Sequence, residues 1–283
     1  MIMKIHILAL ATVFTMAWGS CSDSTNETNI SVTDSSTGIE KENWTDSVAR
    51  FRESARLGDG HAYLSLAKCY SQGKGVDMDF LLTWQMAKMA VQYNGISSVD
   101  EFFDSLPEDS HFRLLIDAIG DFNFQHYDEA LQKADLLAEH FPADASLIRA
   151  AVALEEGKRE KALSLLDEAA AQGNLLAAIA VSIVNEGEEA IYRYAEQMPT
   201  LYCRMARESF TTDIDPAEDE MAAALYRKAD KHLCLDSTGV RWLLSYYEYN
   251  MKNGRYMVDN SELERLRLLN SRLAHQQTRD ELK

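Results

Sequence analysis

The chain has 283 residues, of which 46% are hydrophobic, with only 13 Gly and 4 Pro. This composition can fill a sizeable apolar core and excludes a collagen-like or wholly disordered chain, and the scarcity of Gly and Pro argues against a β-sandwich. Asp and Glu number 45 against 28 Lys and Arg, which gives a net charge of −17. Because so acidic a chain repels phosphate backbones, we expect no nucleic-acid partner.

Residues 1–20 have the layout of a bacterial secretory signal peptide. Lys4 precedes an apolar run from Ile5 to Trp18, which is short for a membrane-spanning helix of about 20 residues. The following Gly19-Ser20-Cys21 resembles the end of a lipobox, in which cleavage before the Cys leaves a lipidated N-terminus. We therefore expect a lipid on Cys21. Cleavage after Gly19 by a peptidase that leaves no lipid is the alternative.

Residues 21–43 are predicted to form a disordered polar tether. They are dominated by Ser, Thr, Asn, Asp and Glu, and so few large apolar side chains cannot offset the entropy lost on ordering. Ser22-Asp23 resembles the start of the acidic export signal of Bacteroidetes lipoproteins. We expect the chain to be lipid-anchored to the outer membrane of a bacterial cell envelope, on the periplasmic face or at the cell surface. No later stretch is apolar and long enough to span a membrane.

Residues 44–283 are expected to form one helical-repeat domain. Near its start an apolar stripe recurs at helical spacing, in Ala62, Leu66, Cys69 and Tyr70. The Gly73-Lys74-Gly75 turn that follows allows the chain to reverse through positive φ, because glycine carries no Cβ. The pattern predicts two antiparallel helices, and Trp84 on the second is interpreted as a core residue.

The same stretch resembles a Sel-one-like repeat, a relative of the tetratricopeptide repeat. The resemblance implies an all-α fold, specifically a right-handed α-solenoid of antiparallel helix pairs, in a protein that serves as an interaction scaffold. The positions that agree with the family pattern are Ala55, Gly58, Ala62, Leu66, Tyr70, Gly73, Gly75, Val76, Asp79, Trp84, Ala87 and Ala90.

The middle of the chain resembles tetratricopeptide repeats. Tyr127–Leu131 and Arg159–Leu163 carry the same second-helix signature, with a shift of 32 residues between Ala130 and Ala162. The expected period is about 34 residues. Clearer repeats are therefore assigned to residues 44–185, and degenerate repeats with a C-terminal capping helix to 186–283.

Two details of the last segment are also predicted. The capping helix should begin with an N-cap at Asn260 or Ser261. On the preceding helix, Trp242, Tyr246 and Tyr249 share a face and are expected in the core, which leaves Tyr247 as the exposed ring.

A search for catalytic or metal-binding patterns yields none. The His residues form no pair at helical i, i+4 spacing, and no CxxC, GxSxG or phosphate-binding loop occurs. Cys69, Cys203 and Cys234 are interpreted as small buried hydrophobes, with a Cys203–Cys234 disulfide as the alternative. We expect neither an enzyme nor a cofactor or metal.

The leading hypothesis is a non-enzymatic, lipid-anchored protein that binds a basic or neutral protein or peptide. The alternatives are a structural subunit of an outer-membrane assembly or secretion complex, and a glycan-capture protein or envelope hydrolase. In tetratricopeptide arrays the first helix of each pair lines the inner surface. Here Glu155 is expected to supply a charge and Leu154 an apolar contact, although Glu155 could instead only solubilise an exposed helix. The segments expected to line the surface are Gly60–Ser71, Asp144–Glu156 and Leu175–Val184.

Overall fold

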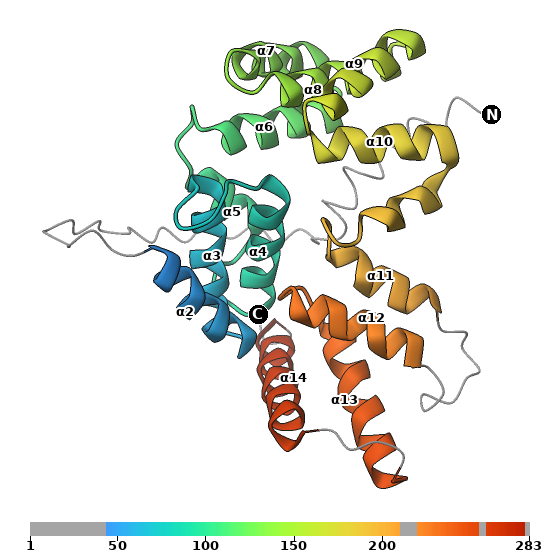
Figure 1. Cartoon of the computed structure of the whole chain (residues 1–283). Helices are drawn as coiled ribbons and strands as arrows, with labels where there is room; N and C mark the ends of the chain where they lie inside the picture. Colours follow the sequence, from blue (N-terminus) through green and yellow to red (C-terminus); the bar gives the residue numbers. More distant parts are fainter. Residues whose placement is uncertain (1–43, 210–219, 255–258, 281–283) are drawn as a thin grey trace, which may run out of the picture. The chain divides into compact units, whose positions relative to one another are not determined.

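The computed structural model describes residues 44–209, 220–254 and 259–280, and these ranges contain helices and no strand (Figure 1). The all-α class is therefore confirmed. The signal peptide, the tether and Cys21 lie outside the described residues. None of the helices in the described ranges is both long and apolar enough to cross a membrane.

The described residues divide into two compact units. Unit 1 contains Leu114–Ala190 together with Trp44, and unit 2 combines Thr45–Arg113 with Ile191–Lys283. Unit 2 is thus discontinuous in sequence. Each unit has its own helix packing and is described by itself.

Unit 1 is a succession of antiparallel helices in which neighbours along the chain pack together. Helix α7 packs on α8, α8 on α9, and α9 on α10 (Figure 1). Fully buried alanines such as Ala130 and Ala162 allow these helices to approach closely. The helices are α6 (His111–Asn123), whose first residues belong to unit 2, α7 (Tyr127–Ala138), α8 (Pro142–Glu155), α9 (Arg159–Ala171) and α10 (Leu175–Glu186).

Three helices of unit 1, α6, α8 and α9, end in the same way. Gln125, Gly157 and Gly173 take left-handed φ values of 64°, 76° and 90°. In each case the next residue's N–H bonds the carbonyl five residues back, and the left-handed residue bonds the carbonyl three back, which is the Schellman arrangement. Gln125 and Gly157 are 32 residues apart, the shift predicted from the sequence signatures.

Unit 2 contains three antiparallel pairs, α3 with α4, α11 with α12, and α13 with α14. Aspartates cap both helices of the first pair: Asp59 accepts from the N–H of His61, and Asp79 from that of Leu82. Its elements are α2 (Trp44–Arg56), α3 (Gly60–Gln72), α4 (Phe80–Gln92), α5 (Val99–Asp104), the 3₁₀ helix η1 (Glu188–Tyr194) at its boundary, α11 (Thr200–Ser209), α12 (Glu220–Lys231), α13 (Ser237–Lys252) and α14 (Asn260–Asp280).

The predicted first repeat agrees with the structure. The whole apolar stripe of α3 is buried, and Gly73 and Gly75 have φ of 64° and 73°. Trp84 is 7% exposed and its ring lies 5.4 Å from that of Phe103, so its interpretation as a core residue is confirmed.

Unit 2 joins helices from the beginning of the chain to helices from its end. The Gln85 side chain on α4 donates to the carbonyl of His232 at 3.2 Å, and Arg272 on α14 donates to the carbonyl of Gly58 at 2.6 Å. In a linear solenoid each repeat contacts only its neighbours. These contacts between residues 147 and 214 positions apart therefore depart from a purely linear stack.

Two predictions for the last segment were wrong. Asp259, not Asn260 or Ser261, caps α14, since its carboxylate accepts the Ser261 N–H at 3.0 Å. On α13 it is Tyr247 that is buried, at 4% exposure, while Tyr249 is 37% exposed. Helix α13 is covered by both α12 and α14, so its buried arc is wider than one apolar stripe.

Candidate functional site

The sequence-predicted binding residues lie at the end of α8 in unit 1. Glu155, the last residue of α8, is half-buried, whereas Leu154 is only 7% exposed. Helices α7 and α9 both pack against α8, so Leu154 lies in the core and has little surface to offer a partner. The expected combination of an exposed apolar contact with Glu155 does not occur.

Glu155 instead lies near Tyr127, the first residue of α7. Burial, and secondly the negative charge of Glu155, raise the pKa of Tyr127. The structure therefore brings the end of α8 together with the α6–α7 turn. This pairing was not predicted from the sequence, although Tyr127 was noted as part of a repeat signature.

Unit 1 concentrates the acidity of the chain. Residues 114–190 contain 15 Asp and Glu against 5 Lys and Arg. Three of the five basic side chains are already paired with acids, in Lys133–Asp121, Arg149–Asp135 and Lys158–Glu156. The excess of negative charge is therefore offered to solvent or to a partner.

A side-chain hydrogen bond joins α8 to α10, two helices that contain segments expected from the sequence to line a binding surface. The side-chain amide of Asn174, the N-cap of α10, donates to the carboxylate of Asp144 on α8. Asn174 also accepts the Ala177 N–H at 2.9 Å, so one side chain caps α10 and ties it to α8.

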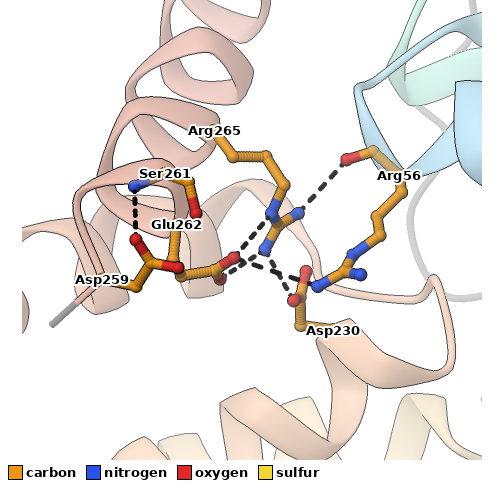
Figure 2. A network of polar contacts seen from close by, with 6 residues as sticks. All are labelled: Arg56, Asp230, Asp259, Ser261, Glu262 and Arg265. Atoms are coloured by element: carbon orange, nitrogen blue, oxygen red, sulfur yellow. Dashed lines mark hydrogen bonds and ion pairs between the residues drawn. The ribbon is translucent and has the colours of Figure 1, made fainter.

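Unit 2 contains a nearly buried ionic network around Arg265, which was not identified from the sequence. Figure 2 shows its guanidinium between two carboxylates, with Asp230 at 2.6 Å and Glu262 at 2.6 Å. It also donates to the backbone carbonyl of Arg56 at 3.2 Å. One side chain thus links α2, α12 and α14.

The charged groups of this network shift one another's pKa values. Burial raises the pKa of Asp230, and the charge of Arg265 only partly counters it. Hydrogen bonding from Arg265 lowers the pKa of Glu262. Burial opposes the charge on Arg265, but the two acids outweigh it and raise the arginine's pKa. Each guanidinium nitrogen of Arg265 donates to a protein acceptor, so this side chain holds the three helices together.

An aromatic cluster lies on α13 and α12. The Trp242 ring stacks on Tyr246 with centroids 5.2 Å apart, and lies 5.4 Å from the ring of Tyr226. A shallow pocket of about 310 Å³ opens beside it, and its described lining residues are Thr238, Arg241, Trp242 and Ser245 of α13. Its volume is at the lower limit for a small-molecule site.

The three cysteines of the described ranges, Cys69, Cys203 and Cys234, are buried and form no disulfide with one another. Cys203 donates through Sγ to the carbonyl of Cys234 at 3.5 Å, so the two residues are neighbours without a disulfide between them. Burial raises the pKa of the Cys203 thiol to about 12. Within the described ranges, His, Cys, Asp and Glu form no group of three that could hold a metal ion.

Comparison with known proteins gives no family: no family model, no curated protein and no solved structure matches this chain. The similarity to Sel-one-like and tetratricopeptide repeats therefore stays a prediction, which rests on the quoted residues.

Phe124 was also missed by the sequence analysis. It is 74% exposed in the α6–α7 turn, and a signal for it exists in the sequence. When the two repeat signatures are aligned at the 32-residue shift, the α6–α7 turn corresponds to the α8–α9 turn, which we call the sister turn. Phe124 then aligns with Glu156, so the α6–α7 turn has an aromatic residue where the sister turn has a charged one.

Proposed function

We propose that this protein is a non-enzymatic, lipid-anchored binding protein of the bacterial cell envelope, and that unit 1 is a short right-handed solenoid segment that captures a basic protein or peptide. The observation that carries the proposal is that unit 1 combines stacked helix pairs with an excess of negative charge, since it contains 15 acidic and 5 basic residues. Stacked helix pairs present extended surfaces, and opposite charge accelerates capture of a partner.

The remaining parts of the proposal follow from the N-terminal sequence. A lipid on Cys21 would hold the protein at the outer membrane, and residues 22–43 would give the helical units reach from it. Fatty-acid labelling of cells tests this step. Wild type should carry the label and fractionate with membranes, and Cys21→Ala should lose both. A mature N-terminus at Ser20 would contradict it.

Affinity purification from detergent-solubilised membranes tests the binding function. Wild type should retain a stoichiometric protein partner, and Glu155→Lys should retain less of this partner than wild type does. The difference between the two proteins should be larger at low salt than at moderate salt, because salt screens the interaction of exposed charges. Asp167→Lys, an exposed acid on the second helix α9, is the matched control and should behave as wild type. If wild type retains no protein partner, the proposed function is wrong.

A further inference from the structure

The α6–α7 turn of unit 1 presents an exposed aromatic residue. Phe124 is 74% exposed, more than any other large hydrophobic side chain in the described ranges. One further ring adjoins it, that of His126, whose centroid lies 6.3 Å away. Tyr127 follows His126 in the chain, and its half-buried ring lies 5.9 Å from that of the buried Phe122. Aromatic residues, Phe among them, are enriched in protein interfaces relative to the rest of the surface.

Backbone hydrogen bonds hold the turn that carries Phe124. The Phe124 N–H bonds the Gly120 carbonyl at 3.0 Å, the Gln125 N–H bonds that of Phe122 at 3.0 Å, and the His126 N–H bonds that of Asp121 at 2.8 Å. Gln125 adopts a left-handed φ of 64°, a conformation that disfavours a residue with a Cβ. A turn fixed by its own hydrogen bonds loses little freedom when a partner binds.

The sister turn shows that the fold does not require these aromatic residues. At the 32-residue shift, Phe124, Gln125 and Tyr127 correspond to Glu156, Gly157 and Arg159, yet both turns have the same hydrogen-bond pattern. The α6–α7 turn therefore carries an aromatic residue and a strained glutamine where charge and glycine suffice.

Negative charge surrounds the aromatic residues. Asp128 and Glu129 are exposed in the first turn of α7, and Glu155 at the end of α8 is close enough to Tyr127 to raise its pKa. An exposed ring bordered by carboxylates fits a partner in which an apolar side chain is flanked by Lys or Arg. The same carboxylates disfavour an anionic lipid surface.

We propose that the α6–α7 edge docks a basic peptide segment whose apolar side chain covers Phe124 and whose Lys or Arg residues pair with the neighbouring acids. The edge is defined as Phe124, His126, Tyr127, Asp128, Glu129 and Glu155. This inference rests on the proposed function and moves the contact from the helix faces to the turns between helices.

The test uses a short fluorescein-labelled peptide in which lysines alternate with leucines, with fluorescence anisotropy as the readout. Wild type should bind it at low salt, and Phe124→Ser should weaken binding about tenfold. Leu136→Ser is the matched control, because Leu136 is a 64% exposed apolar residue of α7 outside the edge, and it should leave the affinity unchanged. Replacing the peptide's leucines by glycine should abolish the difference between wild type and Phe124→Ser.

Three outcomes would overturn the inference. In the first, wild type does not bind the lysine–leucine peptide. In the second, Phe124→Ser and Leu136→Ser lose the same peptide affinity. In the third, the protein sediments with phosphatidylglycerol vesicles and this sedimentation depends on Phe124. Circular dichroism of both variants checks that folding is intact. The proposed function has its own test, and it is wrong if wild type captures no partner from membranes. If a partner is captured equally well by wild type and Phe124→Ser, only the proposal for the α6–α7 edge is rejected.

Discussion

The guanidinium of Arg265 on α14 donates a hydrogen bond of 3.2 Å to the backbone carbonyl of Arg56, the last residue of α2 and 209 positions earlier in the chain. The same side chain pairs with Asp230 on α12 (Figure 2). Helices from both segments of unit 2 therefore meet at one charged group. Such a group stabilises the fold only while all its partners are present, because each would be costly to bury alone.

Replacing Arg265 by Met should destabilise unit 2 by about 3 kcal/mol, because the carboxylate of Asp230 would stay buried without a counter-charge. Arg267→Met is the control: Arg267 is exposed and pairs with Glu248 and Glu264, so its loss should leave the stability close to that of wild type. Urea unfolding followed by circular dichroism measures both, and equal losses would contradict the assignment.

The pH dependence of stability should change in Glu262→Gln. Hydrogen bonding from Arg265 lowers the pKa of Glu262 in the folded protein below 4.5. The ionised Glu262 therefore contributes its full stabilisation of the fold above pH 4.5, and this contribution is lost as the pH falls through the lowered pKa of the folded state. The stability gap between wild type and Glu262→Gln should therefore narrow below pH 4.5. Asp230 acts with opposite sign, because its raised pKa lets the native state bind a proton first.

Urea titrations between neutral and acidic pH measure this gap. Glu264→Gln, which removes an exposed carboxylate from the same helix, provides the comparison and should run parallel to wild type. A gap for Glu262→Gln that stays constant down to acidic pH would reject the role of the carboxylate.

Gly95→Ala should cost about 3 kcal/mol or more, because a Cβ at Gly95 would lie 2.1 Å from the backbone oxygen of Gly60. Gly157→Ala separates this steric effect from backbone strain. Its Cβ would meet nothing within 4 Å, and only its φ of 76° opposes the substitution, at about 1 kcal/mol. Thermal unfolding of the two variants should rank them in that order, and the reverse order would show that the two backbones are not in contact.

The three described cysteines should be inert to an aromatic disulfide reagent in the native protein. Each is buried, and burial raises the pKa of the Cys203 thiol to about 12, so almost no thiolate exists at neutral pH. In a Cys21→Ser background, three thiols should react after unfolding in guanidinium. One thiol after unfolding would instead show a Cys203–Cys234 disulfide in the protein as purified.

The sequence by itself determined the local structure. The stripe from Ala62 to Tyr70 predicted α3, and the glycines that follow predicted its left-handed turn, because helical period and positive φ depend on neighbouring residues alone. The 32-residue shift likewise recurs in the turns at Gln125 and Gly157. Of the two residues proposed from the sequence for binding, Glu155 is half-buried at the surface, whereas Leu154 is buried because α7 and α9 both cover α8.

Only the tertiary structure decided which faces are covered and which distant helices meet. Tyr247 and Tyr249 lie on one helix and differ in exposure because of the packing of α12 and α14, which no spacing within α13 encodes. The contact between Arg265 and Arg56 has no signature in either repeat, since it arises when segments 209 residues apart fold into the same unit. Periodicity records the conformation of adjacent residues, whereas burial and ion pairing depend on neighbours that the chain brings together only on folding.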